Sequence, residues 1–356
     1  MPAVASAPHR PPPKVARSHR TVTQARPDAR RLSVLGAGSW GTALALVLAR
    51  NHHEVALWGH RPAAMQAMAR QRHNPDYLSD IPLPPNIHPH ASLGASLADT
   101  DAVLVVVPSA AFAGTLQRLA DELPPHCPVI WATKGLDETG QLLHVTAERL
   151  LPGHPLGVLS GPSFAGEVAA GLPTAVALAS HDAATGEHLA EAFRDERFRV
   201  YTSDDVIGVE LGGAVKNVLA IATGIADGMG FGANARAGLI TRGLAETRRL
   251  GARIGARDET LTGLAGMGDL ILTCTDDQSR NRRLGLALGR GEPMARATGT
   301  IGQVVEGTDT ATRVMQLAAA HDVEMPICAA VKAVVAGDLD PAEATRALLQ
   351  RPPRRE

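Results

Sequence analysis

The chain has 356 residues, enough for two domains with sizeable cores, and its 45% hydrophobic and 20% charged residues are typical of a globular protein. The net charge is −1, but the first 31 residues carry seven Lys or Arg against one Asp, so the body is mildly acidic. This acidity and the low aromatic content of 3% argue against nucleic-acid binding, and prolines break the long uncharged stretches, which argues against membrane insertion.

The N-terminal head and the cysteines bear on location. Residues 1–30 contain a run of three prolines and scattered arginines, without the apolar core of a secretory signal, so we expect a disordered basic extension. An organelle transit peptide is the alternative. Cys127, Cys274 and Cys328 lie far apart, as expected for reduced thiols rather than a disulfide framework or a metal site. We therefore expect a cytoplasmic protein without a bound metal.

A strand, a glycine-rich turn, a helix and a second strand open the folded part of the chain. They are predicted in that order at residues 32–35, 36–41, 42–49 and 54–58. The turn has the spacing of a dinucleotide-binding fingerprint: Gly36 forms the turn, Gly38 lets the backbone approach a pyrophosphate, and Gly41 lets the helix pack on the sheet. The diphosphate would rest on the helix N-terminus. The alternative is a glycine-rich corner that binds nothing.

The end of the second strand bears on which cofactor binds. A strict NAD site has an Asp or Glu about 20 residues beyond the first glycine, whereas this strand runs into Gly59, His60 and Arg61. His60 and Arg61 can face a 2′-phosphate instead. We therefore expect NADPH to be preferred and NADH to be accepted. The alternative is that Arg61 only caps a surface turn.

The remaining elements predict the fold class. Further strands are expected at residues 101–107, 129–133, 156–160, 174–179 and 198–201, alternating with helical stretches. From about Asp205 only helices are expected, at residues 206–226, 235–254, 279–288, 308–320 and 329–335. The chain is thus expected to be α/β, with an N-terminal Rossmann-like, doubly wound, mostly parallel sheet followed by an all-α C-terminal domain. We expect the dinucleotide-binding domain at 31–204, the helical substrate domain at 205–345 and a frayed tail at 346–356.

The helix predicted at residues 206–226 carries a candidate catalytic amine. The chain has four lysines against 31 arginines, so a lysine inside the fold suggests a need for an ammonium that can release its proton. Lys216 and Asn217 share one side of the helix with Gly213 and Gly224, which would let a small molecule approach closely. Burial would lower the pKa of the amine toward that of a general acid near neutral pH. The alternative is a lysine whose stem packs while its head reaches solvent, and the helix alone does not decide.

Three other places add polar groups near strand ends or tight turns. Lys134 follows an apolar strand, at the carboxyl edge of the sheet where ligands bind in such folds. The loop at residues 160–165 also follows a strand, and its small residues suit close contact with a ligand. Asp269 lies on a glycine turn in apolar surroundings, where the alternative role is a simple helix cap.

The stretch from Ser279 onward predicts an anion site. Ser279 is expected to cap a helix, which places Arg280 and Asn281 in a first turn where the helix dipole disfavours a cation. A bound anion would resolve that conflict with backbone N–H groups and a guanidinium. The alternative is a solvated basic face that includes Arg282 and Arg283.

The ordered motifs resemble the bacterial NAD(P)-dependent sn-glycerol-3-phosphate dehydrogenase family over residues 31–340. The motifs that carry the resemblance are GAGSWGTA at 36–43, ATKG at 132–135, GPSFA at 161–165, VKN at 215–217, GMGDL at 266–270, SRNRRLG at 279–285 and VVEG at 304–307. The long basic head departs from the family's usual abrupt start at the first strand.

The resemblance implies an enzyme that reversibly reduces dihydroxyacetone phosphate to sn-glycerol 3-phosphate for glycerophospholipid synthesis, with Lys216 as the catalytic residue. The substrate contacts it implies are Lys134, Gly161, Ser163, Lys216, Asp269, Ser279, Arg280 and Asn281. Besides Gly36, Gly38 and Gly41, the implied dinucleotide contacts are Ser39, Trp40, His60, Arg61, Lys134, Ala165, Arg280, Val304 and Glu306. The partner is then a small phosphorylated ketone or alcohol, and a homodimer is compatible with this interpretation.

Two other functions compete with this one. A related two-domain dehydrogenase, such as a ketopantoate reductase, would act on a carboxylate, and the turn at Arg280 and Asn281 favours phosphate over carboxylate. A dinucleotide-sensing module without turnover would not require Lys216. These alternatives predict different effects of substitutions at Arg280 and Lys216.

Overall fold

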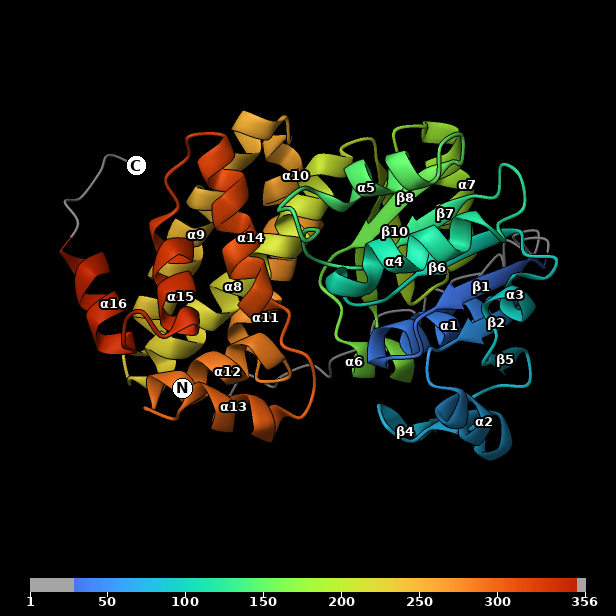
Figure 1. Cartoon of the computed structure of the whole chain (residues 1–356), viewed down its shortest axis with the longest axis horizontal. Coiled ribbons are helices and arrows are strands. Elements are labelled where there is room, and N and C mark those ends of the chain that lie inside the picture. Colours follow the sequence, from blue (N-terminus) through green and yellow to red (C-terminus); the bar gives the residue numbers. More distant parts are fainter. Residues whose placement is uncertain (1–28, 351–356) are drawn as a thin grey trace, which may run out of the picture.

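The computed structural model describes residues 29–350 and shows a sheet-containing half beside a helical half (Figure 1). The main sheet has eight strands in the order β10-β9-β8-β7-β6-β1-β2-β5. Their bounds are β1 Arg31–Leu35, β2 Glu54–Trp58, β5 Ile87–His90, β6 Ala102–Val105, β7 Val129–Trp131, β8 Leu156–Ser160, β9 Thr174–Ala179 and β10 Phe198–Ser203. Of the neighbouring pairs, β8 with β9 is antiparallel and the others are parallel. The mostly parallel sheet predicted from the sequence is confirmed.

Three strands were not predicted from the sequence. They are β5 at the edge of the main sheet and a separate antiparallel hairpin of β3 (His73–Asn74) and β4 (Leu78–Pro82). Pro82 in β4 and Pro89 in β5 argue against a strand in the sequence, because proline lacks a backbone N–H and is tolerated mainly at sheet edges. The hairpin projects from the sheet half beside α2, at the lower right of Figure 1.

Helices cover both faces of the sheet. Strand residues alternate between the two faces: Val34 and Ile130 pack in the cluster that contains α1 and α7, whereas Leu35 and Trp131 pack in the cluster that contains α4 and α5. The helices of this half are α1 Ser39–Arg50, α2 Pro62–Gln71, α3 Leu93–Leu97, α4 Ser109–Ala120, α5 Leu143–Leu150, α6 Ala165–Ala170 and α7 Ala183–Phe193. The doubly wound arrangement expected from the alternation of strands and helices is confirmed.

The described part of the second half is all helical, as expected, and it is built around α8. Its helices are α8 Val206–Gly228, α9 Gly232–Ile254, α10 Asp258–Thr262, α11 Asp269–Thr275, α12 Arg280–Gly289, α13 Met294–Ile301, α14 Gly307–Ala320, α15 Pro326–Ala336 and α16 Pro341–Leu349, with a π-helical turn at Leu264–Gly268. In the described residues α8 is long and apolar enough to span a membrane, but 94% of its apolar window is buried inside the protein. It is therefore the core helix of this half.

The domain boundaries expected from the sequence can be placed against these elements. The division expected between residues 204 and 205 falls between the end of β10 and the start of α8. The tail was expected from residue 346, but α16 continues to Leu349, because Asp340 and Glu343 form a capping box at its start and Leu348 packs on the helical core. The expected basic extension lies outside the described residues except for its last two, of which Arg30 is bonded to His53 and His188.

Candidate functional site

The glycine-rich turn between β1 and α1 leaves room for a ligand at one glycine and packs tightly at the other two. Gly36 has a φ of +126°, and a Cβ added there would lie 2.2 Å from the Val106 carbonyl oxygen. A Cβ on Gly41 would lie 1.8 Å from the Gly36 carbonyl oxygen, whereas one on Gly38 would meet nothing within 4 Å. No side chain caps α1 by a hydrogen bond, so the N–H groups of its first turn can receive an anion. This turn fits the diphosphate of a dinucleotide.

A cleft of about 960 Å³ opens at this turn. β1 and β6 are neighbours in the sheet, but the chain leaves them in opposite directions, from β1 toward β2 and from β6 toward β7. In open α/β sheets, ligands bind at the carboxyl ends of two such strands. Most of the predicted site residues line the cleft: Gly36, Gly38, Ser39, Trp40, Gly41, His60, Arg61, Lys134, Ser163, Ala165, Lys216, Ser279, Arg280, Asn281, Val304 and Glu306. Gly161 and Asp269 do not line the cleft, but both accept a hydrogen bond from Lys134 Nζ, and Lys134 lines it.

A buried carboxylate holds two lysines at the cleft. Asp269 Oδ1 accepts from Lys216 Nζ at 2.6 Å, and Asp269 Oδ2 accepts from Lys134 Nζ at 2.6 Å. Lys216 Nζ also donates to Thr273 Oγ1 at 3.0 Å, and Lys134 Nζ to the Gly161 carbonyl oxygen at 3.2 Å. The Lys216 head therefore does not reach bulk solvent, and the Asp269 side chain is no helix cap, so both alternative roles considered from the sequence are wrong.

The electrostatics of this group follow from burial and from the three charges. Burial lowers the pKa of Lys216 to about 8; the Asp269 carboxylate opposes this change and the nearby Lys134 charge adds to it. Burial alone would raise the pKa of Asp269, but the two ammonium groups outweigh it and hold that pKa below its usual value. The ionised Asp269 carboxylate thus holds Lys134 beside Lys216, whose amine can exchange its proton near neutral pH.

A second buried carboxylate joins the strand that precedes Lys134 to the helix that carries Lys216. Glu210 on α8 accepts from Trp131 Nε1 of β7 at 2.9 Å and from the backbone N–H and Nδ1 of His144 on α5. Burial raises the pKa of Glu210, and the His144 contact opposes that change. The sequence analysis missed this residue, since a lone Glu on an apolar helix has no partner that can be read from spacing.

The stretch predicted to bind an anion forms a helix N-terminus at the edge of the cleft. Ser279 caps α12 as predicted, its Oγ accepting from the Arg282 N–H at 3.2 Å. Arg280 Nη1 donates to the Val304 carbonyl oxygen at 2.8 Å. Asn281 is buried and links Asn217 to the Gly307 N–H. Arg280 thus places a guanidinium at the cleft in the first turn of α12.

Arg282 does not lie on a solvated basic face, which was the alternative for this stretch. It is buried and pairs with Asp227 and Asp277, so it joins α12 to the end of α8. Arg283 is exposed and lines the cleft. The two neighbouring arginines therefore have different environments, because successive helix positions point in different directions.

The glycine-lined side of α8 is only partly available to a ligand. A Cβ on Gly224 would lie 2.2 Å from the Arg282 carbonyl oxygen and 2.9 Å from Gly285 Cα, so α12 occupies this part of the side. The expectation that a small molecule would approach Gly224 is wrong, since its small size serves close packing of two helices. The approach remains open nearer Lys216 and Asn217, which line the cleft.

Several buried polar atoms around the site have no protein partner. Within residues 29–350 these include Ser160 Oγ, Asn217 Nδ2 and Trp40 Nε1. Asn217 and Trp40 line the cleft, in its helical and sheet halves respectively. A buried donor without a partner is costly, so these atoms fit a polar ligand. Glu306 also lines the cleft, and desolvation raises its pKa against the charges of Arg280, Lys216 and Lys134.

The β3–β4 hairpin contributes cleft residues that the sequence analysis missed. Asn74 Nδ2 donates to the Ala37 carbonyl oxygen at 3.0 Å and to Thr42 Oγ1 at 2.7 Å, and thereby fixes the hairpin to the glycine-rich turn. Asp76 Oδ2 lies 2.6 Å from Arg61 Nη2. Arg61 is the N-cap residue of α2, but its side chain makes no capping hydrogen bond to that helix. The Asn-Pro-Asp sequence signals a turn, but its contact with the glycine-rich turn depends on tertiary folding.

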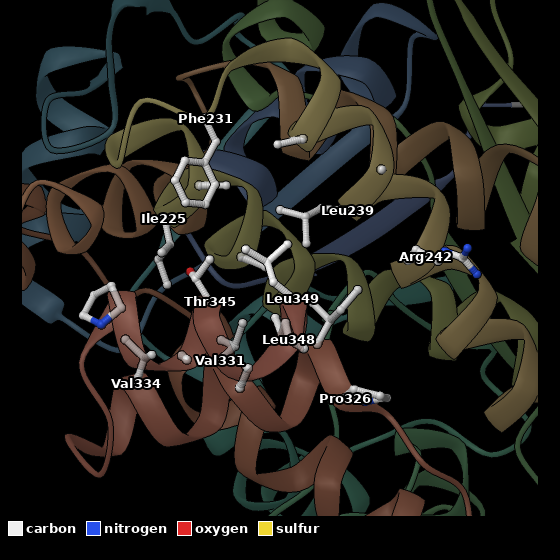
Figure 2. Close-up of a pocket in the computed structure, with 18 of the residues that line it drawn as sticks. Ile225, Phe231, Leu239, Arg242, Pro326, Val331, Val334, Thr345, Leu348 and Leu349 are labelled. Carbon is white, nitrogen blue, oxygen red and sulfur yellow. The ribbon is translucent and has the colours of Figure 1, made fainter. Parts of the chain in front are cut away.

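A second cavity, of about 450 Å³, lies in the helical half among α8, α9, α15 and α16. Figure 2 shows Leu239 of α9 facing Leu348 and Leu349 of α16 across it. Its buried carboxylate, Glu246, accepts from the backbone N–H groups of Ile327 and Cys328, and burial raises the pKa of Glu246 to about 7. None of the predicted site residues lines this cavity, so the larger cleft is the candidate functional site. In residues 29–350, no group of three or more His, Cys, Asp or Glu is arranged to hold a metal ion.

Comparisons with known proteins agree over nearly the whole chain. Family models described as the N-terminus and C-terminus of NAD-dependent glycerol-3-phosphate dehydrogenase match residues 31–186 and 205–346. Two proteins named glycerol-3-phosphate dehydrogenase (NAD(P)+) are each 58% identical to this chain. The match to the protein from Alkalilimnicola ehrlichii covers 92% of this chain and 99% of that protein. The match to the protein from Thioalkalivibrio sulfidiphilus covers 90% of this chain and 97% of that protein. A crystal structure of glycerol-3-phosphate dehydrogenase from Coxiella burnetii is 49% identical with a TM-score of 0.89, covering 91% of this chain and 100% of that one. The chain therefore belongs to the NAD-dependent glycerol-3-phosphate dehydrogenase family.

Proposed function

We propose that this chain reversibly reduces dihydroxyacetone phosphate to sn-glycerol 3-phosphate and that Lys216 transfers the proton. As a member of its family it is an NAD(P)-dependent oxidoreductase acting on a small phosphorylated compound. The observation that most supports the role of Lys216 is its amine at the cleft, buried and bonded to Asp269. An absorbance assay of the reduced nicotinamide, with both cofactors and with phosphorylated and carboxylated ketones, tests the assignment. Turnover of ketopantoate instead of dihydroxyacetone phosphate would contradict it.

The proposed chemistry assigns one role to each charged group. The reduced nicotinamide, when bound, supplies the hydride to the ketone carbon. The Lys216 ammonium stabilises the negative charge that develops on the carbonyl oxygen and donates a proton to it. In the reverse direction the neutral Lys216 amine takes that proton. Asp269 holds the amine in place, and Lys134 lies near enough to lower the pKa of Lys216.

We further propose that the N-terminus of α12 holds the substrate phosphate, with Arg280 and Ser279 as contacts and Lys134, Gly161, Ser163 and Asn281 completing the substrate site. The amide groups of a first helical turn and a guanidinium are suited to a phosphate. Remote binding of this group positions the carbonyl for reaction.

Replacing Arg280 with alanine is expected to raise the KM for dihydroxyacetone phosphate by roughly 10- to 100-fold, because the variant loses one charge-assisted hydrogen bond to the phosphate. Activity on unphosphorylated dihydroxyacetone should change far less. Arg290→Ala is the matched control, since Arg290 is exposed at the other end of α12. Steady-state kinetics on both ketones measure the effect, and equal losses on the two would contradict a phosphate site.

We propose that NADPH is preferred over NADH, with dinucleotide contacts at Gly36, Gly38, Ser39, Trp40, Gly41, His60, Arg61, Lys134, Ala165, Arg280, Val304 and Glu306. The support is that Arg61 lines the cleft beyond β2, where the adenosine ribose binds in such folds. Arg61→Ala is expected to weaken NADPH binding by roughly tenfold or more and to leave NADH binding nearly unchanged. Fluorescence titration with each reduced cofactor measures this, with Arg70→Ala at the other end of α2 as control. A matched loss for both cofactors would remove the reason for the preference.

We also propose that the protein is a cytoplasmic homodimer whose product supplies glycerophospholipid synthesis. Exposed Phe231 and Leu349 border the apolar cavity of the helical half, and exposed apolar patches favour association (Figure 2). Light scattering would measure the mass. The three cysteines are free thiols, as a reducing compartment favours, and cell fractionation checks the location.

A further inference from the structure

A carboxylate lies beside Arg61, although the carboxyl end of β2, the strand that precedes Arg61, supplies none. The positions after β2 are Gly59, His60 and Arg61, so the acid that usually binds the adenosine ribose is missing there. The β3–β4 hairpin brings one from farther along the chain, with Asp76 Oδ2 2.6 Å from Arg61 Nη2. The two side chains are 47% and 52% exposed, and both line the cleft. A ligand in the cleft therefore meets a carboxylate and a guanidinium at the same place.

The position of Asp76 is set by a turn that is anchored to the glycine-rich loop. Buried Asn74 donates its two side-chain hydrogen bonds to the Ala37 carbonyl oxygen and Thr42 Oγ1. The Tyr77 N–H donates to the Asn74 carbonyl oxygen at 3.3 Å and closes a four-residue turn with Pro75 in its second position, where proline is favoured. Asp76 is the third residue of this turn. Its backbone is thus fixed relative to the loop that fits the diphosphate, while its carboxylate stays accessible.

We propose that Asp76 is a specificity-determining residue that selects between the two cofactors. Its carboxylate accepts a hydrogen bond from the adenosine ribose hydroxyl of NADH, taking the place of the acid missing after β2. It repels the 2′-phosphate of NADPH and competes with that phosphate for Arg61. Arg61 therefore favours NADPH and Asp76 favours NADH, so that one cleft accepts both. This inference rests on the proposed placement of the adenosine ribose beside Arg61.

Binding titrations without substrate test the role of Asp76 apart from turnover. Asp76→Ala is expected to lower the Kd for NADPH roughly three- to tenfold and to raise the Kd for NADH by a similar factor. Asp76→Asn should keep the tighter NADPH binding and lose less NADH binding, because an amide oxygen still accepts a hydrogen bond. Asp80→Ala is the matched control: Asp80 is exposed on β4 of the same hairpin, and its removal changes the net charge equally. The inference is overturned if Asp76→Ala shifts both cofactors in the same direction or if Asp80→Ala reproduces its effect.

The Arg61 variants separate this inference from the cofactor preference on which it rests. If Arg61→Ala selectively weakens NADPH but Asp76→Ala does not discriminate, the preference stands and the role of Asp76 is wrong. If Arg61→Ala does not discriminate, the preference itself fails. Competition for Arg61 also predicts that Asp76→Ala gives a smaller gain in NADPH affinity in the Arg61→Ala background, because coupled residues are non-additive. Equal gains in both backgrounds would overturn the competition.

Discussion

Replacing Lys216 with alanine is expected to lower kcat for dihydroxyacetone phosphate reduction by about 10³-fold or more, while NADPH binding stays close to that of the unaltered protein. The variant loses the group proposed to stabilise the developing charge and to donate the proton, and each of these roles contributes at least about 10²-fold in enzymes. Lys216 contacts Asp269 and Thr273, so its removal leaves the glycine-rich turn untouched. Absorbance of the reduced nicotinamide measures turnover, and fluorescence titration measures cofactor binding.

A matched lysine variant controls for general effects of losing a lysine. Lys332→Ala removes an exposed lysine on α15, away from the cleft, and should leave both kcat and cofactor binding unchanged. Thermal unfolding of both variants shows whether the fold persists. Unchanged turnover in a folded Lys216→Ala protein would reject the proposed role of Lys216.

Replacing Asp269 with asparagine is expected to lower the free energy of unfolding and to move the pH profile of reduction to lower pH. The change keeps the shape of the side chain but leaves two ammonium groups without their shared counter-charge, and breaking a buried ion pair costs about 3–5 kcal/mol. Reduction needs the protonated Lys216, whose pKa is about 8, so activity in this direction should fall as the pH rises through about 8. Without the carboxylate the Lys216 pKa falls further, and the loss of activity should move to lower pH.

Two measurements check the Asp269 prediction. Denaturant unfolding gives the change in the free energy of unfolding, and kcat/KM for reduction as a function of pH gives the position of the fall in activity. Asp309→Asn on α14 is the control, because Asp309 is exposed and its loss should change neither quantity appreciably. A pH profile that stays in place in the Asp269 variant would show that this carboxylate does not tune Lys216.

The corrected interpretations show which kind of information the sequence lacks. The glycines of α8 suggested a ligand surface, but Gly224 packs against the α12 backbone, because small side chains serve both purposes equally well. In the sequence Arg282 cannot be distinguished from its exposed neighbour Arg283, because its two carboxylate partners, Asp227 and Asp277, are brought to it by folding. Strand β5 and the β3–β4 hairpin were missed because their prolines argue against strands, whereas sheet edges tolerate them.

Local sequence by itself determined the glycine-rich turn with its flanking strands and helix, the doubly wound sheet, the following helical half and the Ser279 cap. Each depends on backbone conformation or hydrophobic periodicity within a few residues, and these preferences can be read directly. Tertiary structure alone decided that Asp269 pairs with Lys216 and with Lys134, which lie 53 and 135 residues away, and that Asp76 reaches Arg61. Electrostatic interactions act through space between groups that the packed core brings together, so their partners cannot be read from spacing along the chain.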